Sequence, residues 1–234
     1  MVGSETPFFL TRGVILLPQD IMTGNWLQMA SAARLTTIAT HITPSQVTSF
    51  IRTPLCRCPQ CKDLTDSEQT LILENALIKA LRRLDPKATL AHLAYLNTLK
   101  APVQIKPEPG IFLEYAPIRR RHDEPLRCRE KDGDDPNTSH AAMLEALAGN
   151  LGVFGSEDAQ VLEYWLDVSR FASWKREKTI AIPWHQHVFE QDLGTYASFG
   201  IRHITRFACW GDGDYITRFG EPPVQAYGEA LWKF

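Results

Sequence analysis

The chain has 234 residues, of which 44% are hydrophobic and 22% charged, and its net charge at pH 7 is -2. This length suits one domain with a sizeable core. The near-neutral charge gives no electrostatic basis for binding nucleic acid or an anionic membrane surface. No apolar run approaches the ~20 residues of a transmembrane helix. We therefore expect a globular protein that binds neither nucleic acid nor membrane.

The cytoplasm is the expected location. The N-terminus lacks the basic start and long apolar core of a signal peptide. Five cysteines is an odd number, and three of them lie within residues 56–61. That arrangement argues against the disulfide framework of a secreted protein.

Six strand-like segments alternate with helical patterns along the chain. The predicted strands, which are short apolar runs bounded by turn residues, are 11–17, 36–42, 89–96, 110–115, 159–169 and 203–210. The predicted helices, in which apolar residues recur every three or four positions, are 25–34, 65–84, 139–151, 186–199 and 224–232. Alternating strands and helices predict an α/β fold with a parallel sheet.

Particular residues mark the ends of these elements. Residues 65–68, with the sequence Thr-Asp-Ser-Glu, predict a capping box at the start of a long helix. Gly152 is expected to end the helix that begins near Ser139. Two polar segments, 119–137 and 211–215, are predicted to be surface loops.

The predicted strand 159–169 carries two acids on either side of a tryptophan. Because strand side chains alternate between faces, Glu163, Trp165 and Asp167 are expected to share one face. An indole ring can cover the apolar side of a pyranose while carboxylates bind hydroxyls or transfer protons. The alternative is a strand end with solvated acids and a tryptophan in the core.

The carboxyl ends of parallel strands are where α/β proteins place their active residues. This rule selects His41, Tyr95, Glu114, Glu163, Asp167 and Trp210, followed by Asp212 and Asp214. Glu114 and Glu163 end consecutive predicted strands. They could satisfy the spacing of the two carboxyls in a retaining glycosidase, ~5–5.5 Å, or in an inverting one, ~6.5–9.5 Å. The alternative is a structural ion pair between Glu114 and the basic run 119–121.

Cys56, Cys58 and Cys61 offer three thiolates, whereas zinc takes four ligands. Cys128, Cys209 or a histidine could supply the fourth, but no second Cys-x-x-Cys is present. Packed free thiols are the favoured interpretation, with a zinc site or a redox motif as alternatives. No cofactor is predicted.

Several segments resemble a family of glycoside-hydrolase-like barrels of unknown function, related to the family-20 hexosaminidases and the α-glucuronidases. The matching segments are 12–14, 56–61, 110–117, 161–169, 200–203, 221–223 and 227–229. The resemblance covers nearly the whole chain, and the Leu-Glu-Tyr-Trp-Leu-Asp stretch is its most specific part. It implies a (β/α)₈ TIM-barrel-like fold that acts on or binds carbohydrate.

The chain departs from that family near residues 51–56, where the third and fourth βα units are missing. In the related hexosaminidases an Asp-Glu pair ends the fourth strand. The only such dipeptide here, at 123–124, lies in a polar loop and does not replace that pair. We therefore expect one barrel domain over residues 1–234, incomplete with about six strands. Its exposed edges make a homo-oligomer possible.

The sequence thus predicts a glycoside-hydrolase-like protein whose ligand is a carbohydrate. Glu163 and Glu114 are the expected catalytic residues. The expected substrate-binding residues are His41, Tyr95, Trp165, Asp167 and Trp210. The alternative is a carbohydrate-binding or interaction protein that keeps the scaffold without a complete acid/base pair.

Overall fold

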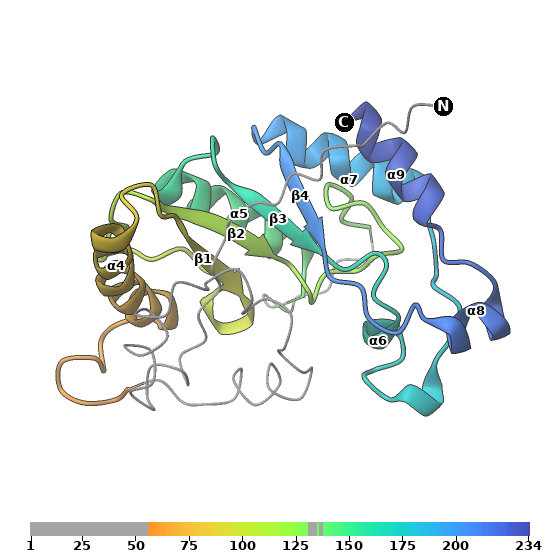
Figure 1. The fold of residues 1–234 in the computed structure, drawn as a ribbon, viewed down its shortest axis with the longest axis horizontal. Coiled ribbons are helices and arrows are strands. Elements are labelled where there is room, and N and C mark those ends of the chain that lie inside the picture. Colours follow the sequence, from red (N-terminus) through yellow and green to blue (C-terminus); the bar gives the residue numbers. More distant parts are fainter. Residues whose placement is uncertain (1–55, 131–134, 136–137) are drawn as a thin grey trace.

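The computed structural model describes residues 56–130, 135 and 138–234, and these form an α/β arrangement (Figure 1). Its four parallel strands lie in the order β1-β2-β3-β4. They are β1 (Leu90–Tyr95), β2 (Ile111–Ala116), β3 (Gln160–Glu163) and β4 (His203–Arg206). In the part of the chain that is described, the sheet does not close into a barrel. The predicted α/β class is confirmed, whereas a full (β/α)₈ barrel is not shown.

Helices connect and flank these strands. They are α4 (Asp66–Leu84), α5 (His140–Phe154), α6 (Val168–Phe171), α7 (Gln186–Ser198), α8 (Gly213–Phe219) and α9 (Val224–Lys233), with 3-10 turns η2 (Leu96–Thr98) and η3 (Arg176–Lys178). The strands predicted at 11–17 and 36–42, the helix predicted at 25–34 and the proposed deletion up to residue 55 lie outside the described residues. No helix in the described part of the chain is long and apolar enough to cross a membrane.

The register of the strands determines which side chains share a face of the sheet. Neighbouring strands place His92 beside Leu113 and Tyr115 beside Val161. Because side chains alternate, each face collects every second residue. The first face, here called the helix-covered face, carries Leu90, His92, Ala94, Ile111, Leu113, Tyr115, Val161 and Glu163. The second face carries Leu93, Tyr95, Glu114, Ala116, Gln160 and Leu162.

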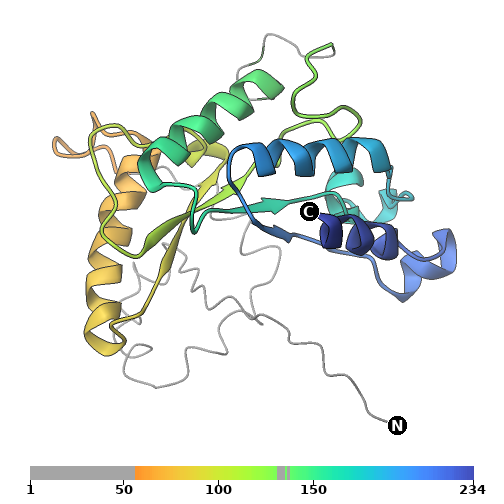
Figure 2. The same ribbon diagram turned by 90° about the horizontal axis from the view of Figure 1, so that it is seen from above.

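The main hydrophobic core lies between the helix-covered face and helices α4, α5 and α7. Figure 2 shows α5 and α7 on one side of the sheet and α4 beside β1. Leu71 and Ile78 of α4 pack against Leu90 of β1. Met143 of α5 and Tyr196 of α7 belong to the larger cluster over β2 and β3. Burying this apolar surface is the main term that stabilises the sheet.

The second face has a smaller cluster of its own. Ala116, Ile118 and Tyr164 form its centre, with Leu93 and Phe207 among the residues packed around them. Among the described residues, the members of this cluster come from strands and the segments that follow them, and none comes from an α-helix. No described α-helix therefore contributes to the apolar cluster on the second face, next to the carboxyl ends of the strands.

The capping box predicted at residues 65–68 is present and does more than start α4. The Thr65 hydroxyl accepts from the Glu68 backbone N–H, and the Thr65 backbone N–H donates to Glu68 Oε2 at 2.8 Å. Glu68 Oε1 accepts from the backbone N–H groups of Val103 at 3.2 Å and Gln104 at 2.6 Å. The buried carboxylate thus joins the start of α4 to the segment between β1 and β2.

Replacing Glu68 with alanine is expected to lower the free energy of unfolding by about 3 kcal/mol, because the change removes an ionised acceptor from several backbone donors. Urea unfolding measures the loss. Glu145→Ala, at an exposed position of α5, is the matched control and should change stability by less than about 0.5 kcal/mol. Equal effects of the two changes would contradict this role of Glu68.

The strand predicted over 159–169 ends at Glu163 instead of continuing to Ser169. The chain turns there, since the Asp167 backbone N–H donates to the Tyr164 carbonyl at 3.1 Å. Asp167 then becomes the N-cap of α6, accepting from the Ser169 backbone N–H. The prediction that Glu163, Trp165 and Asp167 share one strand face was wrong, because strand alternation stops at Glu163.

Three other local predictions also differ from the structure. Helix α5 continues through Gly152 to Phe154, and its C-cap is Gly155, whose φ of 79° is a backbone conformation that favours glycine. Segment 211–215 contains the start of α8, with Asp212 as its N-cap. Segment 119–137 is not simply a surface loop, since Arg120 and His122 in it are buried.

Candidate functional site

Glu163 lies at the end of β3, fully buried on the helix-covered face. Its Oε1 accepts from Arg120 Nε at 2.8 Å and from the Tyr196 hydroxyl at 2.5 Å. Its Oε2 accepts from the Tyr164 backbone N–H at 3.2 Å and lies 3.3 Å from His122 Nε2. Both carboxylate oxygens are therefore engaged by the protein itself.

Arg120 is the centre of this network. Its fully buried guanidinium also forms an ion pair with Asp192 of α7 and donates to the Arg121 carbonyl at 2.6 Å. Asp192 in turn accepts from the Leu126 backbone N–H at 2.8 Å. The guanidinium carbon lies 5.6 Å from the centre of the Trp165 ring. The Arg120 cluster, defined as Arg120, His122, Glu163, Asp192 and Tyr196, thus ties segment 119–137 to β3 and α7.

The charges of this cluster follow from its contacts. Burial by itself would raise the pKa of Glu163, but the Arg120 charge and the hydrogen bonds from His122 and Tyr196 lower it to about 2. Burial, together with the Arg120 charge, lowers the pKa of His122 to about 3. At neutral pH Glu163 is therefore an anion and His122 is neutral. This is the arrangement of a structural ion pair.

Glu114 has a different environment, on the second face. Gln160 Nε2 donates to its Oε1 at 2.7 Å, and its Oε2 has no hydrogen-bond partner among the described residues. The residue is only 4% exposed, and this burial raises the pKa of its carboxyl group, which the Gln160 hydrogen bond lowers in part. The basic run 119–121 therefore pairs with Glu163 through Arg120 rather than with Glu114.

Glu114 and Glu163 are not brought together as the sequence predicted. Glu114 lies opposite Gln160 in the register of β2 and β3, and the two side chains share a face. Glu163 follows Gln160 by an odd number of residues, so its side chain projects from the other face. The two expected catalytic carboxyls are separated by the sheet.

Other side chains gather near Glu114 at the carboxyl ends of the strands. Asp167 is fully buried; its Oδ1 accepts from the Ser169 hydroxyl at 2.6 Å, and its Oδ2 has no hydrogen-bond partner among the described residues. Burial raises the pKa of Asp167, which the hydrogen bonds from Ser169 lower in part. Burial and the charge of Asp167 raise the pKa of Tyr95 to about 12.

Tyr164, the residue after Glu163, belongs with Tyr95 to the apolar cluster on the second face. Burial raises the pKa of its hydroxyl, and the charges of Tyr95, Glu163, Asp167 and Glu114 raise it further. We call Tyr95, Glu114, Tyr164 and Asp167 the carboxyl-end cluster.

The two tryptophans expected to stack on a sugar have other partners. Trp165 is 4% exposed and packs at the core, with its ring centre 4.6 Å from that of Phe189. Trp210 is half-buried, and the Arg176 guanidinium carbon lies 5.5 Å from its ring centre. The environment of Trp165 is that of a core residue, and one side of Trp210 is already occupied. His41 lies outside the described residues.

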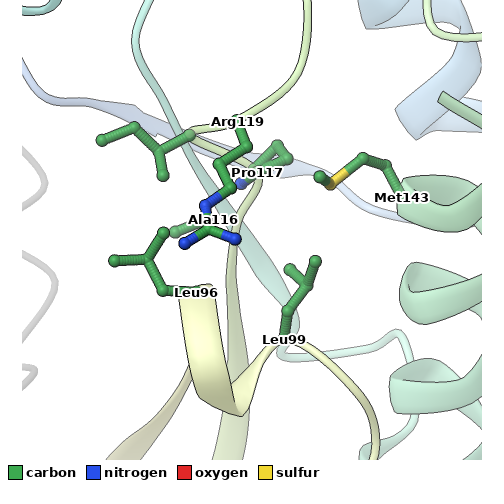
Figure 3. A pocket seen from close by; sticks show the side chains of 7 residues that line it. Leu96, Leu99, Ala116, Pro117, Arg119 and Met143 are labelled. Atoms are coloured by element: carbon green, nitrogen blue, oxygen red, sulfur yellow. The ribbon is translucent and has the colours of Figure 1, made fainter. Parts of the chain in front are cut away.

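A small crevice lies beside the carboxyl ends of β1 and β2 (Figure 3). It is lined by Leu96, Leu99, Ala116, Pro117, Ile118, Arg119 and Met143. The Arg119 side chain extends into it (Figure 3). Its cavity volume of about 10 Å³ is the space of a single water, which is too small for a sugar ring in this conformation.

Two groups of side chains in the described residues could hold a metal ion. They are Cys56, Cys58 and Cys61, and Glu124, Cys128 and Glu130. The second group combines two acids with one thiol, and Glu124 already has interactions within the protein. The three cysteines are the chemically coherent set, since thiolates bind soft metal ions.

Comparison with protein-family models gives a match over about half of the chain. Residues 40–153 match the family model of a domain of unknown function, DUF4838. No curated protein and no solved structure matches the chain. The matched segment includes Tyr95 and Glu114 but ends before β3, so Tyr164 and Asp167 lie beyond it. The match supports an uncharacterised family and names no activity.

The sequence analysis missed the Arg120 cluster and the position of Tyr164. Arg120 belongs to a polar run without periodicity, so no pattern marks it as buried. Tyr164 was overlooked although it is the next residue after Glu163. Strand alternation could have indicated it, because a residue next to Glu163 points to the opposite face.

Proposed function

We propose that this chain is a glycoside-hydrolase-like protein that binds a carbohydrate at the carboxyl-end cluster, with Glu114 as its general acid. The observation that carries the proposal is the state of the Glu114 carboxyl group. It is buried, its pKa is raised, and one of its oxygens has no partner among the described residues.

A glycosidase general acid must hold a proton until it transfers it to the leaving oxygen. Burial against apolar neighbours is the usual physical means of keeping a carboxyl protonated. In this chain Gln160 fixes one oxygen of Glu114, and the other oxygen is buried without a hydrogen-bond partner among the described residues. Asp167 supplies a second buried carboxyl with one such oxygen, and Tyr95 and Tyr164 supply hydroxyls.

Residues with a strained backbone follow several of the strands whose carboxyl ends form the proposed site. Leu96, Ser173, Trp174 and Trp210 are the non-glycine residues with positive φ in the described part of the chain. Leu96 follows β1 directly, Ser173 and Trp174 follow α6 after β3, and Trp210 follows β4. Such conformations cost about 1–3 kcal/mol each and cluster at functional sites. Binding a sugar ring next to the crevice requires side chains such as Arg119 to move, and Arg119 is exposed.

The test is the turnover of a panel of aryl glycosides, including hexosaminides and glucuronides, by the protein and by its Glu114→Gln variant. Turnover is expected to fall by about 10²–10⁴-fold, because the amide cannot donate the catalytic proton. Binding of the matching monosaccharide should persist. Glu145→Gln, on the surface of α5, is the matched control. Unchanged turnover in Glu114→Gln would overturn the assignment of Glu114.

A second candidate is a carbohydrate-binding protein without turnover. The separation of Glu114 and Glu163 by the sheet favours it, since the predicted pair of carboxyls is not assembled. In that case no aryl glycoside is hydrolysed, while one class of sugar raises the melting temperature of the protein. Asp167→Asn should then weaken the stabilisation by that sugar.

A further inference from the structure

Three cysteines converge at the start of the described chain. The Sγ atoms of Cys56, Cys58 and Cys61 all lie within 4.8 Å of one another. None of the three is in a disulfide; Cys56 is exposed and the other two are partly exposed. The carboxyl-end cluster and the Arg120 cluster do not involve them, so the proposed carbohydrate site leaves these thiols without a role.

Hydrogen bonds fix the backbone of the segment that carries the three cysteines. The carbonyl of Cys58 accepts from the backbone N–H groups of Cys61 at 3.0 Å and Lys62 at 2.9 Å, which closes a tight turn. Gln69, in the first turns of α4, donates through its side-chain amide to the carbonyls of Cys56 at 3.1 Å and Cys61 at 3.0 Å. Both ends of the segment are therefore fastened to the same helix.

The three sulfur atoms lie close enough together to act on one cation. Cysteine sulfur is a soft ligand and therefore suits a soft metal ion.

We infer that Cys56, Cys58 and Cys61 form a binding site for one thiophilic divalent cation such as zinc. Zinc binds cysteine sulfur at ~2.3 Å in a tetrahedron, which places the sulfur atoms about 3.8 Å apart. Because the sulfur atoms lie within 4.8 Å of one another, each separation needs to contract by no more than about 1 Å to reach this geometry. Each thiol loses its proton as the cation binds, and the protons pass to solvent.

Among the described residues, no other metal-ligating side chain joins this group. A bound cation would cross-link the turn that Gln69 holds against α4. Its effect is therefore structural, and it stiffens the segment that leads into the capping box of Thr65 and Glu68. This inference is independent of the proposed carbohydrate function.

The test uses the reduced, metal-free full chain titrated with Co²⁺, whose tetrahedral thiolate complexes absorb visible light. We expect one Co²⁺ per chain, displacement of Co²⁺ by Zn²⁺, and a higher melting temperature with Zn²⁺. Cys58→Ser and Cys61→Ser should each weaken Co²⁺ binding at least about tenfold, because each removes one ligand. Cys209→Ser, at a cysteine outside both candidate metal groups, is the matched control and should bind Co²⁺ normally.

Two results would overturn the inference. The first is a reduced chain that takes up no stoichiometric Co²⁺ or Zn²⁺. The second is binding that Cys58→Ser and Cys61→Ser leave unchanged. Melting curves of the metal-free variants show whether each is folded, and the titration of the unmodified chain does not depend on any variant.

Discussion

Arg120→Met is expected to lower the free energy of unfolding by about 3–5 kcal/mol, measured by urea unfolding at neutral pH. The change removes the only cation paired with Glu163 and Asp192 among the described contacts, and both carboxylates are fully buried. Methionine is unbranched and can pack near the Trp165 ring, whose centre lies 5.6 Å from the guanidinium carbon, but it carries no charge. The loss therefore measures the cost of uncompensated buried charge.

The neighbouring arginine provides the control. Arg121 pairs with Asp123 at 2.6 Å, but its side chain is 43% exposed, and exposed pairs contribute only about 0–1 kcal/mol. Arg121→Met should therefore have a small effect. Adding Glu163→Gln and Asp192→Asn to Arg120→Met should recover part of the lost stability, because no charge then remains unpaired. A triple variant that is no more stable than Arg120→Met would contradict this explanation.

The second large effect is expected in acid, where His122 is predicted to lower the free energy of unfolding. The pKa of His122 is about 3 in the folded protein against an ordinary value of 6.5. Between these values the unfolded chain binds a proton that the folded protein does not. Stability therefore decreases as the pH falls from about 6.5 to 3, by up to about 1.4 kcal/mol per pH unit. The pKa of Glu163 is lowered from 4.5 to about 2 in the folded protein, so Glu163 also decreases stability as the pH falls below about 4.5.

Other buried acids contribute to the pH dependence of stability with the opposite sign. Burial raises the pKa of Glu114, Asp167 and Asp192, so the folded protein retains their protons more readily than the unfolded chain. The contribution of His122 is isolated by comparison with His122→Phe, whose unfolding free energy should depend less on pH above the range of the carboxyls. His203→Phe, at an exposed histidine, should keep the original dependence. Identical pH profiles for the protein and His122→Phe would refute the prediction.

Local signals were sufficient to predict most of the regular structure. The strands at Leu90–Tyr95 and Ile111–Ala116 and the capping box before α4 lie where the sequence predicted them. Each depends on residues a few positions apart, such as an apolar run or a cap three residues from its partner. The prediction for the segment after Glu163 was wrong because it also depended on local composition. The chain turns there between apolar residues, and the composition does not change at the turn.

The candidate site was predicted only in part. Glu114 and Asp167 were selected because they follow or end parallel strands, and both have unpaired buried oxygens among the described residues. Trp165 has the environment of a core residue, because the chain turns before it and points it toward α7. Composition alone could not distinguish an aromatic side chain that binds a ligand from one that fills the core.

The sequence by itself determined the α/β class, the parallel strands and the presence of three cysteines within residues 56–61. The tertiary structure alone decided that Glu163 is a buried ion-pair partner and that Glu114 lies on the other face. The reason is physical: Arg120 meets Glu163 across 43 positions of the chain and Asp192 across 72. Which charge is buried with which partner depends on how distant segments pack, and no local pattern contains that information.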